Sequence, residues 1–105
     1  MVLAAASGGI TVAATPPAFA AAHVCQNNSG YTLGTDPAEI TAHWYHFCDP
    51  GGNSPEDVSI SKDVNGTWVE VAEGSGTATY VCQGTAETQY SVQVYGSYGF
   101  FDDCG

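Results

Sequence analysis

The stretch VSISKDVNGTWVEV, residues 58–71, decides the fold because it contains a complete β-hairpin. Asn65 and Gly66 lie at its centre, and both tolerate the positive φ angles of a type I′ turn. Folding about this turn pairs three residues before it with three after it: Val64 with Thr67, Lys62 with Val69 and Ile60 with Val71.

Side chains alternate between the two faces of a strand, so the hairpin has a core face and a solvent face. We assign five apolar residues to the core: Val58, Ile60, Val64, Val69 and Val71. The polar residues Ser59, Ser61, Asp63 and Glu70 fall on the other face, together with Trp68. Lys62 points toward the core, where an amine needs a partner.

Further strands are predicted after the hairpin. Residues 77–82 and 89–95 have alternating patterns, with turns at 74–76 and 84–87. Tyr90, Val92 and Val94 share one face of the second segment. The chain is rich in Thr, Val, Tyr and Gly, which favours strands over helices. We therefore expect an all-β fold, a small disulfide-stabilised sandwich or barrel of five to seven short antiparallel strands.

Residues 36–48 fit two structures. Asp36, Pro37 and Glu39 resemble a helix start, with a cap, a proline at the first position and a glutamate soon after. A short helix at 37–47 would place Ile40, Trp44 and Phe47 on one face. The same segment also alternates as a strand does, and its aromatic content makes us favour the strand.

The N-terminal segment predicts export. Residues 2–14 are uncharged and mostly small or apolar, and Ala18-Phe19-Ala20 follows a proline pair. This is the pattern of a secretory signal peptide, with cleavage after Ala20 or Ala22, and its alanine content suggests a bacterial pathway. We expect a signal peptide at 1–20, a single β domain at 21–105 and a secreted product without a membrane anchor.

Four cysteines follow the predicted cleavage site: Cys25, Cys48, Cys82 and Cys104. An even number in a small exported chain indicates disulfides rather than a metal site. Three pairings are possible, and we favour Cys25–Cys48 with Cys82–Cys104 because each closes a local loop of about 22 residues. On the chain-entropy account such a loop stabilises the fold by about 3 kcal/mol.

The charge is strongly one-sided, with eleven Asp and Glu residues against the single basic side chain of Lys62. A net charge of −10 repels nucleic acid and anionic membranes. The charge is compatible with a basic protein partner, a divalent cation or an uncharged sugar. We expect a monomer whose partner is a protein or a glycan, and we assign no cofactor.

The candidate binding residues are aromatic. His43, Trp44, Tyr45 and His46 are consecutive, and Trp68 lies on the solvent face of the hairpin. Rigid aromatic rings give a large contact area at a small entropic cost, which suits glycan or protein binding. On a strand His43 and His46 point to opposite faces and cannot share a metal ion. We assign no metal site and no catalytic residue, and we expect a non-enzymatic binding module.

Two alternatives remain open. Cleavage after Ala22 would make His23 the N-terminal residue, and its amine and imidazole could bind copper with His43 or His46. This resembles the copper site of lytic polysaccharide monooxygenases and implies a small oxidative enzyme. The other alternative is a structural module of the cell envelope or surface.

The four-cysteine all-β layout is also similar in outline to the small secreted α-amylase inhibitors. These carry Trp-Arg-Tyr between their first two cysteines, where this chain has Trp44, Tyr45 and His46 without the arginine. The resemblance implies an inhibitor-like protein partner.

Overall fold

The computed structural model describes residues 24–105, and this part is all-β, as the sequence predicts. The predicted signal peptide, both cleavage positions and His23 lie outside the described residues. Residues 24–105 form eight strands, where the sequence predicted five to seven: β1 (Val24–Thr35), β2 (Ala38–Asp49), β3 (Gly52–Pro55), β4 (Asp57–Val64), β5 (Thr67–Ser75), β6 (Thr77–Val81), β7 (Glu87–Val94) and β8 (Gly96–Asp103).

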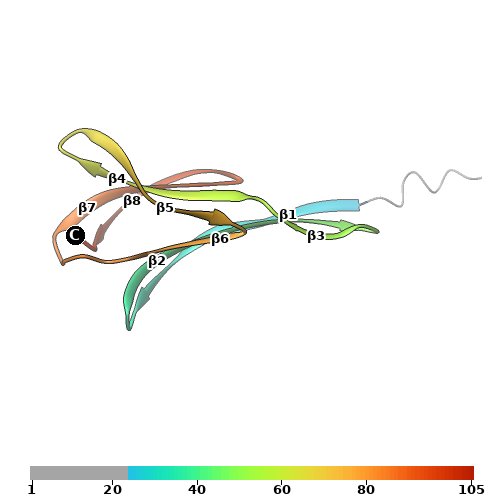
Figure 1. Cartoon of the computed structure of the whole chain (residues 1–105), viewed down its shortest axis with the longest axis horizontal. Helices are drawn as coiled ribbons and strands as arrows, with labels where there is room; N and C mark the ends of the chain where they lie inside the picture. The colour runs from blue at the N-terminus through green and yellow to red at the C-terminus, as the bar shows by residue number, and fades with distance from the viewer. Residues whose placement is uncertain (1–23) are drawn as a thin grey trace, which may run out of the picture.

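Two antiparallel sheets face each other (Figure 1). In the first sheet, the long strand β2 pairs with β1 along one edge and with β3 and β6 along the other. The second sheet has the order β5-β4-β7-β8. The chain crosses between sheets before β4, before β6 and before β7, so neighbours in sequence often lie in different layers.

The core lies between the two sheets. The first sheet contributes Ile40, Ala42, Ala78 and Tyr80, and the second contributes Val58, Ile60, Tyr90, Val92 and Val94, with Cys104 from the chain end. The predicted inward face of residues 89–95 is therefore confirmed. Tyr80 and Tyr90 also meet across the core, with ring centroids 6.0 Å apart.

Residues 37–47 form no helix, and the favoured strand is confirmed as β2. The apparent helix start at Asp36-Pro37 is instead the turn that joins β1 to β2. Ile40 and Ala42 are fully buried, because β2 is the central strand of its sheet and its alternating residues face β4 and β7. Tertiary pairing thus overrides the local capping signal.

The hairpin at 58–71 forms about the predicted turn, with positive φ angles at Asn65 and Gly66. The predicted pairing of Ile60 with Val71 is wrong, because a β-bulge shifts the register and opposes Ile60 to Ala72. The core face was also predicted too long: Val64 and Val69 are 39% and 43% exposed, since they lie toward the hairpin tip.

The segments 77–82 and 89–95 do form strands, β6 and β7, but they belong to different sheets. The connection between them is held by backbone hydrogen bonds from Gln83 and Gly84 to the carbonyl oxygen of Cys104. The Cys82–Cys104 disulfide closes the same corner. Both favoured disulfides are present, and two such bridges in this small fold indicate an oxidising environment.

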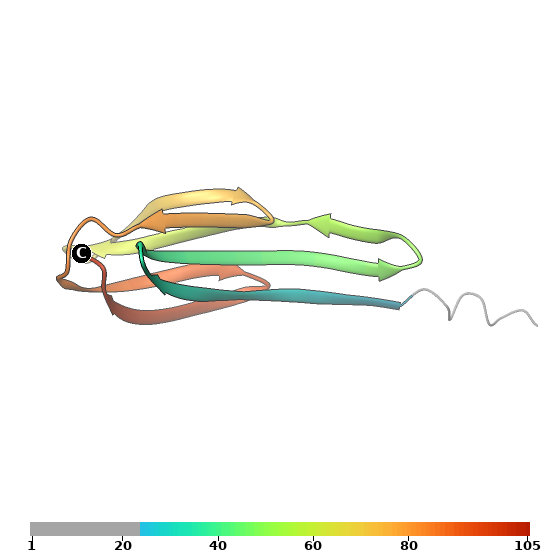
Figure 2. The ribbon, with the colours of Figure 1, turned by 90° about the horizontal axis from the view of Figure 1, so that it is seen from below.

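One end of the first sheet extends past the sandwich (Figures 1 and 2). There only β1, β2 and β3 remain, and no strand of the second sheet covers them. We call this three-stranded extension the arm and define it as residues 24–28, 45–49 and β3. The Cys25–Cys48 disulfide lies within the arm. Within residues 24–105 no helix is long and apolar enough to span a membrane.

Candidate functional site

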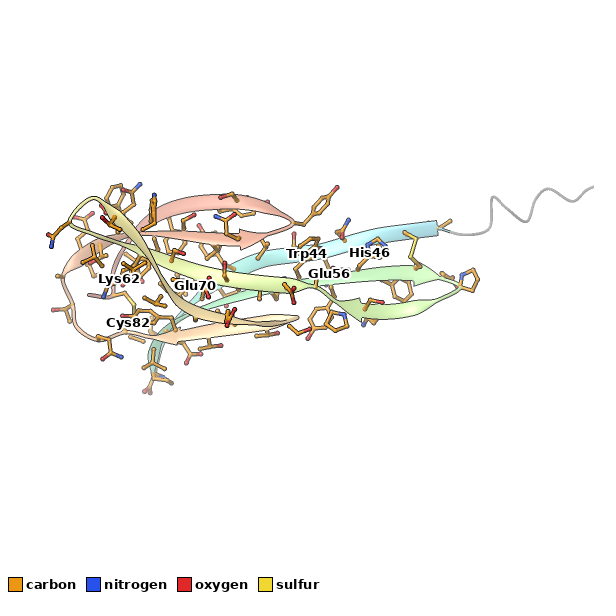
Figure 3. All side chains as sticks on the ribbon, turned by 45° about the horizontal axis from the view of Figure 1, so that its top comes forward. Trp44, His46, Glu56, Lys62, Glu70 and Cys82 are labelled. Carbon is orange, nitrogen blue, oxygen red and sulfur yellow. A yellow bond between two sulfur atoms is a disulfide. The ribbon has the colours of Figure 1, made fainter. Side chains whose placement is uncertain are left out.

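The five predicted binding residues lie on three separate surfaces. Trp44 and His46 share one face of β2, as Figure 3 shows, whereas His43 and Tyr45 alternate with them and belong to the other face. Trp68 lies on the outer face of the second sheet. The structure therefore does not bring the five residues together into one site.

The face of β2 that carries Trp44 and His46 holds a series of side-chain contacts with Asn27 and Cys48, which we call the relay. The antiparallel register places Asn27 opposite His46 and Cys25 opposite Cys48. Trp44 donates its indole N–H to Asn27 Oδ1 over 2.8 Å, and His46 Nδ1 lies 3.2 Å from the same oxygen. On the far side of the ring, His46 Nε2 lies 3.3 Å from Cys48 Sγ.

The indole N–H of Trp44 determines which ring nitrogen of His46 carries a proton. Indole N–H is only a donor, so the Asn27 atom that Trp44 contacts must be the carbonyl oxygen. That oxygen only accepts, and His46 Nδ1 must therefore carry a proton. In the neutral ring Nε2 then directs its lone pair at Cys48 Sγ, and in the imidazolium it directs an N–H there. Sequence analysis missed Asn27, because only the strand pairing places it beside His46.

The opposite face of β2 is engaged in packing. His43 Nε2 lies 3.3 Å from Asn28 Oδ1, and the Tyr45 ring lies against Gly76. Trp44 is also partly enclosed, since its ring lies 5.8 Å from that of Tyr95. These aromatic residues are therefore less available to a ligand than their positions in the sequence suggest.

A shallow hollow of about 380 Å³ crosses the outer face of the second sheet. Its lining combines one aromatic ring with hydroxyl and amide groups: Ser61, Trp68, Ser91, Gln93 and Ser97. Ser61 lies opposite Ser91, and Ser91 opposite Gly99, so a row of small residues crosses three strands of the floor, with Gln93 beside it. We call this hollow the trough.

The polar groups of the trough are pre-arranged. Gln93 donates from its amide nitrogen to Ser91 Oγ over 3.1 Å and to Ser97 Oγ over 2.9 Å. Each hydroxyl accepts one of these bonds and keeps its own hydrogen for a further acceptor. The Gln93 amide oxygen makes neither bond and can accept one. The trough thus offers both donors and acceptors at fixed positions.

Exposed aromatic rings stand on the two outside strands of this sheet. Trp68 on β5 is 51% exposed and Phe101 on β8 is 63% exposed. Three strand spacings separate β5 from β8, or about 14 Å. Glu70 lies opposite Ser61 and adds a carboxylate on the β5 side. Sequence analysis placed Trp68 with Ser61 but missed Ser91, Gln93 and Ser97, because the pairing of β4 with β7 is not local.

Two groups of possible metal ligands occur in residues 24–105: Cys25, His46 and Cys48, and Cys82, Asp102 and Cys104. The two sulfurs of each group are joined in a disulfide, and the thiolate is the form of cysteine that binds metals. The copper alternative rests on His23, which lies outside the described residues. Of its possible second ligands, His46 directs Nδ1 at Asn27 Oδ1 and Nε2 at Cys48 Sγ.

Comparison of the chain with family models, with curated proteins and with solved structures finds no match.

Proposed function

We propose that this protein is a small secreted, non-enzymatic module that binds a neutral glycan in the trough. The observation that carries the proposal is the combination of an exposed Trp68 ring with a floor of serine and glutamine groups. Sugars present apolar C–H faces to aromatic rings and hydroxyl groups to donors and acceptors, so one surface of this kind satisfies both.

The net charge of the chain limits the class of glycan that can bind. A net charge of −10 opposes anionic polysaccharides, and Glu70 beside the trough adds to this repulsion. A carboxylate instead accepts hydrogen bonds from neutral sugar hydroxyls. A glycan is favoured over a protein partner because the floor of the trough is polar, whereas the cores of protein interfaces are depleted in such groups.

Secretion is part of the proposal. Its support is the leader-like segment at 1–20 and the pair of disulfides in a fold with a small core. A secreted module meets polysaccharides outside the cell, where a binding face needs no catalytic group.

Isothermal titration with neutral oligosaccharides built from glucose, N-acetylglucosamine, xylose or mannose tests the proposal. We expect at least one sugar to bind, and Trp68→Ala to weaken its affinity about tenfold or more, as loss of a central aromatic contact does. Phe47→Ala is the matched control, because Phe47 is 39% exposed but lies on the arm. Absence of binding to every sugar, or equal binding by Trp68→Ala, would overturn it.

A further inference from the structure

The two disulfides differ in their surroundings. Cys104 is fully buried in the core, and its bridge to Cys82 closes a corner of the sandwich. Cys25 is exposed and Cys48 half-buried, and their bridge lies in the arm, away from the buried core. The arm bridge therefore has one exposed cysteine for a small thiol to approach, whereas the other bridge joins the buried Cys104 to the half-buried Cys82.

Among residues 24–105, the arm bridge alone has an imidazole beside it. His46 and Cys48 are two residues apart on β2 and share a face, so the ring lies along the strand with Nε2 at 3.3 Å from Cys48 Sγ. The bond between His46 Nδ1 and Asn27 Oδ1 sets the ring orientation, and Trp44 in turn holds Asn27. The order Cys48, His46, Asn27 places a sulfur, an imidazole and an amide next to one another. The same three groups activate the nucleophilic cysteine in enzymes that use one.

We propose that the Cys25–Cys48 bridge is a thiol–disulfide exchange site for small thiols, with His46 stabilising the sulfur that leaves. This site is independent of the trough and of glycan binding.

The exchange proceeds in two balanced steps. A thiolate attacks Cys25 Sγ, a new sulfur–sulfur bond forms, and the electron pair of the old bond leaves on Cys48 Sγ. The imidazolium form of His46 donates its Nε2–H to this thiolate. A second thiolate then attacks the sulfur of the first thiol in the mixed disulfide and releases Cys25. Two thiols are oxidised to one disulfide, and the bridge is reduced by two electrons to two thiols.

The fold allows the bridge to open without loss of the sandwich. The strands of the arm remain paired through backbone hydrogen bonds on both sides of β2. Neither cysteine of the arm belongs to the buried core, and the Cys82–Cys104 bridge stays closed. Reduced Cys25 and Cys48 therefore remain opposite each other and can be oxidised again.

The test is incubation of the folded protein with reduced glutathione, followed by alkylation and peptide mass spectrometry at timed intervals. We expect Cys25–Cys48 to open while Cys82–Cys104 stays closed, and the trapped mixed disulfide to carry glutathione on Cys25. His46→Ala should slow the opening about tenfold, because the leaving thiolate loses its hydrogen-bond donor. His43→Ala, which alters the other face of β2, should leave the rate unchanged.

Asn27→Ala provides a second variant in case His46→Ala perturbs the arm, and it should slow the opening by a smaller factor. The far-ultraviolet circular dichroism of each variant reports folding independently. Opening of both bridges together, or equal rates for wild type, His46→Ala and Asn27→Ala, would overturn the proposal. Loss of glycan binding would leave it unaffected, since the trough lies on the other sheet.

Discussion

Gly76 lies directly against the ring of Tyr45, so close that a Cβ atom at position 76 would stand 2.7 Å from Tyr45 Oη. The backbone of Gly76 has a φ of +83°. Its N–H donates to the carbonyl oxygen of Glu56, and its carbonyl oxygen accepts from the N–H of Trp44. This glycine therefore joins β2, the start of β4 and the crossing to β6 at the base of the arm.

We predict that Gly76→Ala lowers the free energy of unfolding by about 2 kcal/mol or more, because it adds both backbone strain and a steric clash. Urea denaturation followed by tryptophan fluorescence measures this change. The double variant Gly76→Ala with Tyr45→Ala removes the clash but not the strain, so it should show less than the sum of the two single effects. Wild-type stability of Gly76→Ala would contradict the close contact.

Tyr90 is fully buried, and its hydroxyl group has no hydrogen-bond partner among residues 24–105. Burial is the main cause that raises the pKa of Tyr90 to about 12, and the nearby Tyr80 and Asp102 add to it. The neutral form is thus favoured in the folded state. Its contribution to stability is complete below the ordinary tyrosine pKa of 10.0 and is lost as the pH rises toward 12. Ultraviolet titration should show that Tyr90 ionises after the exposed tyrosines.

Tyr90→Phe should leave the free energy of unfolding unchanged or raise it, because it removes a buried hydroxyl without a partner. It should also abolish the late step in the ultraviolet titration. A loss of more than about 1 kcal/mol in urea denaturation would show that the hydroxyl makes a stabilising hydrogen bond.

Lys62 points inward from β4 and ties the chain end to the core. Its Nζ donates to the carbonyl oxygen of Gly105 over 2.7 Å and to Tyr80 Oη over 3.3 Å, and it lies 5.6 Å from the centroid of that ring. Lys62→Met keeps most of the side-chain length but loses these contacts, so we expect a loss of about 1–3 kcal/mol in urea denaturation. Lys62→Arg retains the charge and is the control. Unchanged stability of Lys62→Met would show that the contacts contribute nothing.

The two disulfides should differ in their contribution to stability. Their sequence separations are 23 and 22 residues, so the entropy of the unfolded chain predicts a nearly equal effect of about 3 kcal/mol each. The folded states differ, because the arm can fray when its bridge is absent, which recovers chain entropy. Thermal unfolding should therefore show a smaller loss for the double variant Cys25→Ala with Cys48→Ala than for Cys82→Ala with Cys104→Ala. A larger loss of thermal stability for the Cys25→Ala, Cys48→Ala variant would contradict the idea that the arm frays without unfolding the core.

The local patterns of the chain were sufficient to predict most of the strands. The Asn65-Gly66 turn fixed the hairpin, and the alternation around Tyr90 identified an inward face, because both signals act over a few residues. The bulge was not foreseeable, because it inserts Val71 into β5 and Val71 and Ala72 are both apolar, so either could lie opposite Ile60. The exposure of Val64 and Val69 likewise depends on how far the opposite sheet extends.

The candidate sites were harder to predict than the strands. The sequence identified Trp68 and His46 as chemically capable, but their partners come from other strands: Ser91 and Gln93 for Trp68, and Asn27 for His46. Such partners are set by sheet order and register, which are long-range properties. The spacing of residues along the chain therefore does not predict which residues become partners.

The sequence by itself determined an all-β chain with two local cysteine loops, because side-chain alternation, turn residues and short loop closure are all local. Only the tertiary structure decided which strands share a sheet and that β2 extends beyond the sandwich as an arm. These features follow from the packing of one layer on another, where burial of the core residues selects among pairings that each strand could make equally well alone.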